Sequence, residues 1–345
     1  MIRFGINGFG RIGRCIVRLW LEDKKLQEKM TLVQINSPSG GQVGAHLLKY
    51  DSIHGVAPNQ VEWQAPQLIL DGKKVLYTTE KSLESMAWDD VDIVLECSGR
   101  YKDRETLSVY LSKGVKKVLL SSPGQSMDKT IVYGVNHAAL SIEDDIVSAA
   151  SCTTNCLAPI LDVVMQSREI ISGFMTTIHA YTTDQNLTDA SHKDLRRARA
   201  ASHSMIPTKT GAASTIGQVL PALDGKLDGM AVRVPTANVS LLDLTLNLNE
   251  SIDKQALNDV LYKATVESHK GILGHNDAPL VSCDFNKRTE SSVVDLTQTM
   301  VQDKTVKIMA WYDNEWAFAY RMIDIVMYMN NQKLISKNNE KAFVS

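Results

Sequence analysis

The segment IRFGINGFGRIGR (Ile2–Arg14) decides the fold. A short apolar run, Ile2–Asn7, leads into Gly8, Gly10 and Gly13, which are spaced as G-x-G-x-x-G, and a helix-like pattern follows. A strand, a glycine-rich turn and a helix in this order allow backbone N–H groups to approach a pyrophosphate. The glycines alone could mark an ordinary turn, but their position between strand and helix predicts a dinucleotide-binding domain.

Apolar, β-branched runs recur through the first half of the chain. They lie at Thr31–Asn36, Val91–Ser98, Val115–Ser121, Thr130–Asn136 and Ile146–Ser151, and helix-like segments lie at Arg11–Glu22 and Arg104–Lys113. Alternating helices and nearly continuous apolar strands are typical of a parallel sheet that is covered on both faces. We therefore expect an α/β fold in which residues 1–151 form a doubly wound, Rossmann-type domain.

The pattern changes at Cys152. A helix-like run, CTTNCLAPILDVVMQS, precedes long strand-like segments, namely FMTTIHAYT, GMAVRVPTANVSLLDLTLNLN, LVSCDFN and TVKIMAWYDN. Few helices separate these segments, which predicts an α+β, mostly antiparallel catalytic domain at residues 152–315. It contains a long polar loop at 182–211, and loops of that length are usually functional or disordered. A helical pattern at 316–332 is expected to return to the cofactor domain, and the tail at 333–345 has no predicted role.

Composition excludes several classes of function. Lys and Arg number 37 against 39 Asp and Glu, so there is no basic field for nucleic acid or an anionic membrane. The five cysteines are an odd number without a C-x-x-C pair, which argues against disulfides and against a zinc or other metal site. No signal peptide pattern opens the chain and no apolar run approaches about 18 residues. We expect a cytoplasmic protein.

Cys152, in SAASCTTNC, is the candidate nucleophile. It follows an apolar strand and stands where a helix begins, next to the hydroxyls of Ser151, Thr153 and Thr154. Unpaired N–H groups at a helix N-terminus stabilise a thiolate and can lower its pKa from about 8.5 to about 3.5–7.5. The alternative, a small buried apolar side chain, suits the other cysteines better, and we expect Cys15, Cys97, Cys156 and Cys283 to lie in the core.

His179, in TTIHAYT, is the candidate base. It lies on a predicted strand soon after the Cys152 helix, so it could stand beside Cys152 and take its proton. It is one of eight histidines, and a structural histidine is the alternative.

Eight segments together resemble phosphorylating glyceraldehyde-3-phosphate dehydrogenase. They are INGFGRIGR, SCTTNCLAP, TTIHAYT, HKDLRRARAA, TGAA, RVPTANVS, KGILG and WYDNEW, in the order and at nearly the spacing of that family. The resemblance covers about residues 1–332, and SCTTNC is its most specific motif.

The resemblance implies a homotetramer that acts on a phosphorylated aldehyde and inorganic phosphate. Cys152 would add to the aldehyde to form a thiohemiacetal, with His179 as the base, and phosphate would release the resulting thioester as an acyl phosphate. Two anion pockets are implied, with Thr182, Asp184 and Arg233 in the first, Ser151, Thr153, Thr210 and Gly211 in the second, and Arg197 between them. Asn314 would orient the nicotinamide carboxamide. Arg196 and Arg199 read as a solvated basic surface.

The residues at the end of the second predicted strand bear on cofactor choice. A dinucleotide unit usually carries Asp or Glu there to bind the adenosine ribose, but this chain has Asn36 and Ser37. Without a carboxylate, a 2′-phosphate meets no like charge. Ala190 and Ser191 also resemble the NADP-using members. Lys81 is a candidate contact near the adenine, although the sequence alone favours a surface lysine. We expect NADP to be preferred and NAD tolerated, with these cofactor contacts: Asn7, Gly8, Gly10, Arg11, Ile12, Gly13, Asn36, Ser37, Lys81, Ser98, Gly99, Ser121, Ser191 and Asn314.

Two alternatives remain at this stage. Erythrose-4-phosphate dehydrogenase, a sister family without the phosphorylation step, shares the cysteine and histidine; VYGVN and Trp316 resemble it, whereas Thr182 and TGAA do not. The segment AFAYR, Ala317–Arg321, departs from the usual Gly-Tyr-Ser beside the nicotinamide. A nucleotide-fold interaction protein is the alternative from another class, but the neutral charge and the complete Cys152 and His179 pair speak against it.

Overall fold

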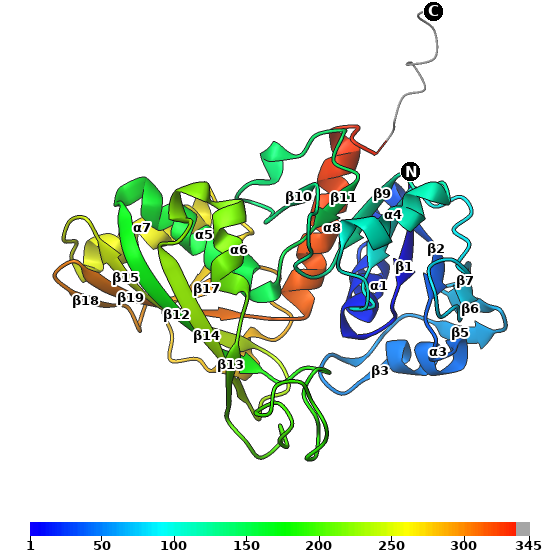
Figure 1. The fold of residues 1–345 in the computed structure, drawn as a ribbon, viewed down its shortest axis with the longest axis horizontal. Helices are drawn as coiled ribbons and strands as arrows, with labels where there is room; N and C mark the ends of the chain where they lie inside the picture. Colours follow the sequence, from blue (N-terminus) through cyan, green and yellow to red (C-terminus); the bar gives the residue numbers. More distant parts are fainter. Residues whose placement is uncertain (336–345) are drawn as a thin grey trace, which may run out of the picture. The chain divides into compact units, whose positions relative to one another are not determined.

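The structure is a computed structural model that describes residues 1–335. The chain divides into two compact units, each with its own main sheet (Figure 1). Unit 1 consists of Met1–Ile131, His137–Ala150 and, within the described part, residues 319–335; unit 2 consists of Val132–Asn136 and Ser151–Phe318. Most of the predicted tail therefore lies outside the described residues.

The main sheet of unit 1 has the strand order β10-β11-β9-β8-β1-β2-β7-β6-β5. Its strands are β1 (Ile2–Asn7), β2 (Met30–Asn36), β5 (Val61–Gln64), β6 (Gln67–Leu70), β7 (Lys73–Thr78), β8 (Ile93–Glu96), β9 (Lys117–Leu120), β10 (Lys129–Thr130) and β11 (Ile146–Ser148). All neighbours from β10 to β7 are parallel, and the antiparallel strands β6 and β5 extend one edge. Strands β8 and β9 are fully buried, as their apolar runs predict for a sheet covered on both faces.

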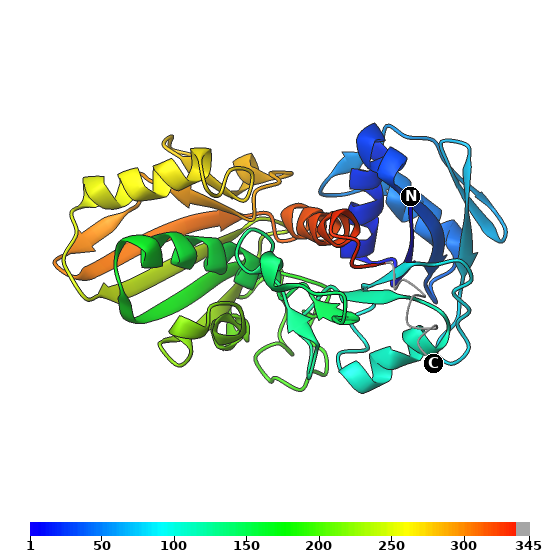
Figure 2. The same cartoon turned by 90° about the horizontal axis from the view of Figure 1, so that it is seen from above.

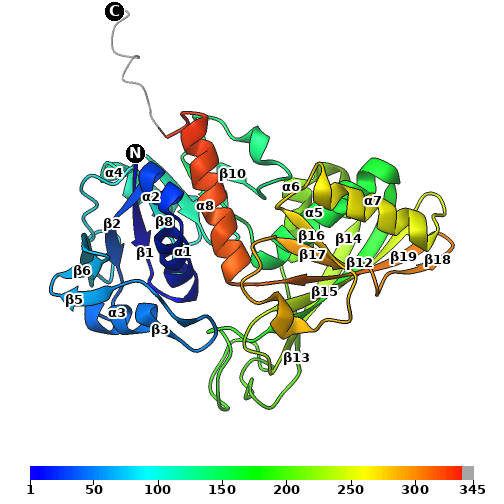
Figure 3. The same ribbon diagram turned by 180° about the vertical axis from the view of Figure 1, so that it is seen from behind.

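The helices of unit 1 are α1 (Arg11–Glu22), α2 (Lys24–Lys29), α3 (Gly41–Lys49), α4 (Arg104–Ser112), the short 3₁₀ turn η1 (His137–Ala139) and most of α8 (Trp316–Asn331). Helix α1 follows β1 directly and buries almost its whole length from Gly13 to Leu21. Helix α3 packs beside β5 and β6, and a small ribbon, β3 (Tyr50–Asp51) with β4 (Gly55–Val56), follows it (Figure 3). The sequence patterns did not predict the strands between residues 50 and 78.

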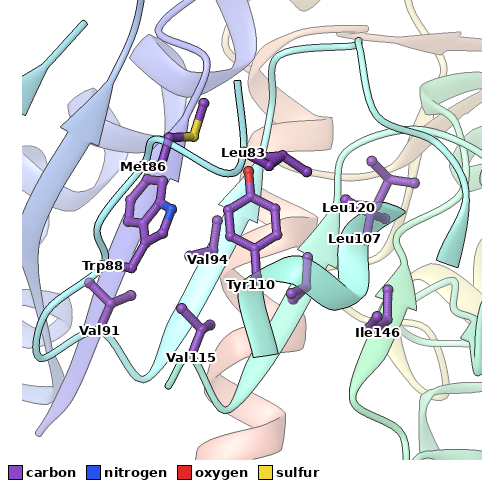
Figure 4. Close-up of a cluster of buried hydrophobic side chains, with 11 residues drawn as sticks. Leu83, Met86, Trp88, Val91, Val94, Leu107, Tyr110, Val115, Leu120 and Ile146 are labelled. Carbon is purple, nitrogen blue, oxygen red and sulfur yellow. The ribbon is translucent and has the colours of Figure 1, made fainter. Parts of the chain in front are cut away.

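A cluster of buried apolar side chains fills unit 1 beneath α4 (Figure 4). The Trp88 and Tyr110 rings meet edge to face with centroids 5.8 Å apart. The Tyr110 hydroxyl leaves the apolar cluster and donates to Glu96 Oε2 at 2.6 Å. This core therefore anchors a polar group at the carboxyl end of β8, where the cofactor residues are predicted.

The sheet of unit 2 has the order β13-β14-β12-β15-β19-β17-β16, with β18 paired to β19. Its strands are β12 (Ile170–Ala180), β13 (Ile206–Lys209), β14 (Leu227–Val234), β15 (Ser240–Leu248), β16 (Leu273–Asn276), β17 (Ser292–Asp295), β18 (Met300–Gln302) and β19 (Thr305–Tyr312). Only β12 with β14 and β16 with β17 run parallel, so the sheet is mostly antiparallel, as predicted.

Helices cover one face of this sheet. They are α5 (Cys152–Ser167), α6 (Ala212–Val219) and α7 (Lys254–Val266). Unit 2 also contains two short 3₁₀ turns, η2 (Pro221–Leu223) between α6 and β14 and η3 (Ser282–Phe285) between β16 and β17. Figures 1 and 2 show α5, α6 and α7 on the same side of the strands. Alternate residues of β12 are accordingly buried, namely Gly173, Met175, Thr177 and His179, whereas the side chain of Phe174 is 72% exposed. The opposite face of the sheet, which carries Phe174, is not covered by these helices.

Two predicted strands are wrong. In Thr130–Asn136 only Thr130 is in a strand; the rest turns at Gly134, whose φ is +91°, and the Asn136 side chain accepts from the Val132 N–H at 2.8 Å. The segment LVSCDFN forms the 3₁₀ turn η3 because the Asp284 carboxylate accepts from the Val281 N–H at 2.8 Å.

The environments of the cysteines also differ in part from the prediction. Cys283 is exposed on the turn η3 rather than in the core. Cys15 and Cys156 are buried, as predicted, and Cys97 is partly buried just after β8. Within residues 1–335, none of the helices has the length and apolar character that a membrane span requires.

Candidate active site

Cys152 is the first residue of α5, and Ser151 caps that helix. The Ser151 Oγ accepts from the Thr154 N–H at 3.0 Å, which satisfies one of the helix's free donors. Ala150 precedes this cap with φ +58°, a conformation that an L-residue adopts only at some cost. The turn between β11 and α5 therefore presents Cys152 at a helix N-terminus on a strained backbone.

His179 lies beside this thiol. The distance from Cys152 Sγ to His179 Nε2 is 3.5 Å, although 27 residues separate the two in sequence. His179 is 3% exposed near the end of β12, and its Nδ1 lies 2.6 Å from the Ala180 carbonyl oxygen and 2.8 Å from Arg233 Nη1. Arg233 is the register partner of His179 on the parallel strand β14. The structure thus brings Cys152, His179 and Arg233 into one constellation within unit 2.

Burial controls the protonation of this pair. It raises the pKa of the Cys152 thiol, and the nearby Arg233 guanidinium only partly opposes this. The backbone N–H groups of Cys152 and Thr153 at the helix N-terminus do lower the thiol pKa, as predicted, but desolvation outweighs them and the net shift is upward. Burial, together with the charge of Arg233, lowers the pKa of His179 to about 3. Both shifts favour the uncharged forms, so we expect the thiol proton to move to His179 as the sulfur attacks.

Tyr312, which the sequence reasoning missed, supports this constellation. Its hydroxyl bonds to Thr153 Oγ1 at 2.9 Å and to Thr177 Oγ1 at 2.7 Å, and its ring meets the His179 ring edge to face at 5.9 Å. Tyr312 ends β19, and its hydroxyl thereby links the start of α5 to β12. Its place in WYDNEW was the available signal, but that motif drew attention only to Asn314.

The predicted anion-binding residues fall into separate groups. Ser151, Thr153 and Arg233 belong to the Cys152 constellation. Thr182, Asp184 and Arg197 belong to the loop at 182–211: Thr182 N–H donates to Gln185 Oε1 at 2.8 Å, and Arg197 pairs with Asp184 and donates to Thr208 Oγ1 at 2.9 Å and to the Lys209 carbonyl at 3.2 Å. Arg197 thus holds the loop together.

Thr210 and Gly211 stand at the N-terminus of α6. The Thr210 Oγ1 accepts from the Ala212 N–H at 3.2 Å, and no hydrogen bond joins either residue to Cys152 or His179 in the described chain. Arg199 is 67% exposed in its side chain and pairs with Asp189, as expected for a solvated surface.

The three glycines of unit 1 fit a pyrophosphate cradle. Gly8 has φ +95°, and a Cβ there would lie 2.4 Å from the Ser98 backbone nitrogen. A Cβ on Gly13 would lie 2.4 Å from the Gly8 carbonyl oxygen, so this glycine lets α1 pack against the turn. Around Gly10 a Cβ would meet nothing within 4 Å, which leaves open space for a ligand against the backbone. The residues therefore fit the group that the sequence predicts.

A small pocket in unit 1 lies where the sequence predicts the adenosine end of the cofactor. The predicted residues Asn7, Gly8, Asn36, Lys81 and Ser98 line it. Pro38, Glu80, Met86, Arg100 and Tyr101, which were not predicted, complete the lining. Lys81 and Arg100 form no ion pair within the described chain, and Glu80 is the acidic residue among those that line the pocket.

Asn36 has a structural role in this pocket. Its Nδ2 donates to Asn7 Oδ1 at 2.9 Å and to the Glu80 carbonyl at 3.1 Å, and its Oδ1 accepts from Thr78 and from the Glu80 N–H. Every polar atom of the side chain is thus used internally. Ser37, the first residue beyond the strand, is buried, and its Oγ lies 3.0 Å from Ser39 Oγ.

The remaining predicted cofactor residues differ in which of their backbone and side-chain groups are already bonded within the protein. The Arg11 side chain pairs with Asp51, so only its backbone at the start of α1, like that of Ile12, faces the cradle. Ser121 N–H donates to the Glu96 carbonyl at 3.0 Å, Gly99 follows β8 with φ +71°, and Ser191 is exposed on the long loop. In unit 2, Asn314 Oδ1 accepts from Ser240 Oγ at 2.9 Å, and Ser240 Oγ accepts from the Ala180 N–H.

Comparisons with known proteins agree with this arrangement. Residues 2–104 match the family model "Glyceraldehyde 3-phosphate dehydrogenase, NAD binding domain", and residues 151–314 match the corresponding C-terminal domain. Glyceraldehyde-3-phosphate dehydrogenase of Pseudomonas aeruginosa is 49% identical over 94% of this chain and 96% of its own length. The Geobacillus stearothermophilus protein of that name is 44% identical over 96% of this chain and 99% of its own.

A plasmid-encoded glyceraldehyde-3-phosphate dehydrogenase of Cupriavidus necator is 46% identical over 94% of this chain and 97% of its own length. Both units are thus matched, the first by a nicotinamide-nucleotide domain and the second by the domain that contains Cys152 and His179. The chain belongs to the glyceraldehyde 3-phosphate dehydrogenase family of NAD-dependent oxidoreductases.

Proposed function

We propose that this chain oxidises glyceraldehyde 3-phosphate with NAD(P)⁺ and inorganic phosphate to 1,3-bisphosphoglycerate, with Cys152 as nucleophile and His179 as base. The observation that carries the proposal is the 3.5 Å approach of Cys152 Sγ to His179 Nε2 at the N-terminus of α5. A nucleophile and a base in direct reach are the minimal requirement for covalent catalysis at a carbonyl carbon. The relatives described above are named for this substrate.

The protein groups divide the reaction into two chemical stages. As the Cys152 sulfur adds to the aldehyde carbon, His179 Nε2 takes the thiol proton and gives it to the oxygen, which becomes the hydroxyl of the thiohemiacetal. His179 takes this proton back as the carbon loses its hydride. The nicotinamide, when bound, supplies the acceptor for the hydride that this carbon loses. A phosphate oxygen then attacks the thioester carbon, the C–S bond breaks, and His179 returns the proton to the departing sulfur.

Three groups of residues would hold the reactants. Arg233 faces the Cys152 and His179 pair directly, and a guanidinium binds phosphate with charge-assisted hydrogen bonds. Thr182 and Asp184 with Arg197 on the loop, and Ser151, Thr153, Thr210 and Gly211 at the starts of α5 and α6, would provide the rest of the two anion pockets. Asn7, Gly8, Gly10 and Gly13 would hold the pyrophosphate end of the cofactor, and Asn314 the nicotinamide carboxamide.

The erythrose-4-phosphate alternative makes a different prediction about phosphate. Its final step is hydrolysis, so its rate should not require inorganic phosphate. Nothing in the comparisons described above favours it. An interaction protein with incidental catalysis, the other alternative, would not need a buried imidazole 3.5 Å from a thiol.

Initial rates with two aldehydes and two cofactors, each with and without inorganic phosphate, test the proposed function. With glyceraldehyde 3-phosphate we expect NAD(P)H formation to fall by at least about 100-fold without phosphate, because the thioester then lacks its acceptor. A rate with erythrose 4-phosphate that exceeds the glyceraldehyde 3-phosphate rate and is indifferent to phosphate would refute the proposal.

Within the proposal, NADP is the preferred cofactor and NAD is tolerated. The support is the uncharged Ser37 after β2, together with Lys81 and Arg100 in the lining of the adenosine pocket. We expect Ser37→Asp to lower kcat/KM for NADP by at least about tenfold and to spare NAD, because a carboxylate repels the 2′-phosphate. Gln64→Glu, which adds the same charge on the exposed strand β5, is the control. A wild-type kcat/KM that favours NAD by tenfold or more would contradict the preference.

The proposal includes a homotetramer. Its support is the outer face of the unit 2 sheet, where Phe174 is 72% and Met230 40% exposed, and the neighbouring loop, where Leu195 is 82% and Met205 76% exposed. Apolar surface of this kind marks a protein interface. Light scattering should give a native mass of about four chains, and Phe174→Asp should lower it. Tyr262→Asp, on the helical face, should not; a monomeric wild type would contradict the assembly.

The proposal also places the enzyme in the cytoplasm. The five cysteines, all within the described chain, are free thiols, as is usual in a reducing compartment.

A further inference from the structure

The side chain of Tyr77, near the end of β7, is buried, and its hydroxyl has no hydrogen-bond partner. The residue is 3% exposed, and within residues 1–335 no protein atom bonds to its Oη. Buried polar groups in folded proteins are almost always paired, so an unpaired buried hydroxyl needs an explanation. It indicates a bonding partner that does not belong to the chain.

The packing around the Tyr77 ring aims this hydroxyl at the first turn of helix α3. The rings of Phe9 and Trp63 meet the Tyr77 ring edge to face, with centroids 6.0 and 5.6 Å away, which fixes its orientation. A Cβ placed on Gly44 of α3 would lie 2.7 Å from Tyr77 Oη, so the helix can approach this closely only because glycine stands there. The hydroxyl is thus held against the N-terminal half of α3.

Helix α3 has unsatisfied donors at the same place. It begins at Gly41, and its N-cap, Gly40, has φ +83° and no side chain with which to cap the helix. The first N–H groups of a helix have no partner within the helix, and together with the helix dipole they favour an anion. The uncapped start of α3 and the unpaired hydroxyl therefore point independently to an anionic ligand.

Two serines between β2 and α3 lie beside the Tyr77 hydroxyl. The Ser37 and Ser39 Oγ atoms are 3.0 Å apart, so the two hydroxyls face each other. Burial raises the pKa of Tyr77, and the nearby hydroxyls of both serines and the charge of Arg14 oppose this rise. Because its pKa is raised, the tyrosine hydroxyl keeps its proton and can donate it in a hydrogen bond to a ligand.

Arg14, on α1, supplies positive charge next to this cluster. The residue is buried, and its Nη1 donates to the Phe9 carbonyl oxygen at 2.7 Å, which fixes the guanidinium near the ring that packs on Tyr77. A guanidinium near the ribose is the usual means by which a dinucleotide domain accommodates a 2′-phosphate. Charge, hydroxyls and helix start thus favour a phosphate over a neutral ligand.

The position of the cluster indicates which phosphate it would bind. Asn36 and Pro38, the neighbours of Ser37 on either side, line the small pocket where the adenosine end of the cofactor is predicted. Ser37 also stands where a dinucleotide domain usually carries the acid that binds the ribose 2′-hydroxyl. A phosphate on the 2′-oxygen of that ribose is the anion that this place would meet.

We propose that Ser37, Ser39 and Tyr77, with the first N–H groups of α3, form the site for the 2′-phosphate of NADP. The tyrosine hydroxyl donates to one phosphate oxygen, the serines and the helix N–H groups donate to the others, and Arg14 stabilises the charge. The inference rests on the proposed function, because it takes the NADP preference as given and names the residues that produce it.

A rival site for the 2′-phosphate exists in the same unit. Lys81 and Arg100 line the adenosine pocket, and a pair of cations can hold a phosphate by charge alone. On that view the Tyr77 hydroxyl has no part in binding, and its removal changes no affinity. A hydroxyl that only supports the fold makes a third prediction, because its removal should then weaken every adenine nucleotide alike.

Binding of two adenosine fragments to the full chain, freed of nucleotide, separates these views without any catalysis. Adenosine 2′,5′-bisphosphate carries the 2′-phosphate and 5′-AMP lacks it, and titration calorimetry in a phosphate-free buffer at constant ionic strength gives the Kd of each. The variants are Tyr77→Phe and Ser39→Ala. Matched controls at exposed positions are Tyr262→Phe on α7 and Ser112→Ala on α4.

We expect wild type to bind the bisphosphate at least about 30-fold more tightly than 5′-AMP, because several donors meet the 2′-phosphate. Tyr77→Phe should reduce this ratio about tenfold, since a hydrogen bond to a charged group is lost, and Ser39→Ala should reduce it in the same direction. The controls should keep the wild-type ratio, and 5′-AMP should bind all five proteins equally. The melting temperature of Tyr77→Phe should not fall, because the unpaired hydroxyl makes no bond that supports the fold.

A ratio that is unchanged in Tyr77→Phe, or an equal loss of affinity for both fragments, would overturn the inference. If wild type still prefers the bisphosphate in that case, the NADP preference survives and the site moves to Lys81 and Arg100. Conversely, a preference that depends on Tyr77, in a protein that forms no NAD(P)H from glyceraldehyde 3-phosphate, would reject the proposed function and keep the site. The two hypotheses can thus fail separately.

Discussion

Cys152→Ser will abolish phosphate-dependent NAD(P)H formation, with a fall in kcat on the order of 10⁴-fold or more. The hydroxyl keeps the shape of the side chain at the start of α5, but it is a far weaker acid than the thiol. The thiol itself is already disfavoured as an anion, since burial raises the pKa of Cys152. A neutral imidazole whose pKa is lowered to about 3 can deprotonate the sulfur only as it attacks, and cannot do so for an alcohol at a useful rate.

The matched control is Cys283→Ser, which makes the same chemical change at an exposed cysteine on the turn η3. Its activity should equal that of wild type. Thermal unfolding should show both variants folded, because each change replaces a single sulfur atom by oxygen and the serine hydroxyl at position 152 can keep the contact with His179. More than a tenth of wild-type activity in Cys152→Ser, or a loss of activity in Cys283→Ser alone, would reject Cys152 as the nucleophile.

The parts of the fold that sequence alone predicts are those governed by local pattern. The helix expected at CTTNCLAPILDVVMQS spans Cys152–Ser167, and the strand before the glycine turn spans Ile2–Asn7. The errors arise where a single side chain overrides an apolar run. The Asp284 carboxylate turns LVSCDFN into η3, and Gly134 with Asn136 turns the end of Thr130–Asn136.

The arrangement around His179 could not be read from the sequence for a different reason. The contact between Arg233 and Nδ1 depends on the parallel register of β12 and β14, in which His179 lies opposite Arg233. These strands are separated by the loop at 182–211 and by β13 and α6, so no periodicity relates them. The sign of the Cys152 pKa shift has the same origin, because burial by distant segments decides it.

The role of Asn36 likewise depends on neighbours that its own strand does not reveal. Sequence spacing placed Asn36 beside the cofactor, but Asn7, Thr78 and Glu80 use all of its polar atoms. Within the proposed function, recognition of the ribose therefore falls to residues beyond the strand, such as Ser37, rather than to Asn36. Spacing predicts the region of the adenosine pocket, whereas hydrogen bonding decides which side chain in it remains available.

Replacing His179 by asparagine tests the second half of the Cys152 pair. We expect kcat to fall by about 10³-fold with little change in KM, since a positioned general base contributes about 10²–10⁴-fold and asparagine cannot accept the proton. Asparagine retains a donor for the Ala180 oxygen, so thermal unfolding should change little. The measurement is the initial rate with saturating glyceraldehyde 3-phosphate, cofactor and phosphate. The control is His203→Asn, the same change at an exposed histidine, which should leave the rate unchanged.

The pH profile gives this prediction its sharpest form. Without a base, only thiol that is already ionised can react, and burial holds the Cys152 pKa above its ordinary value. The His179→Asn rate should therefore rise about tenfold for each pH unit from 7 to 9, as the thiolate fraction does. The wild-type rate should rise much less, because a neutral His179 takes the proton during attack. A profile for His179→Asn that runs parallel to wild type would mean that the imidazole only positions the sulfur, and the base would have to be sought in another group near Cys152.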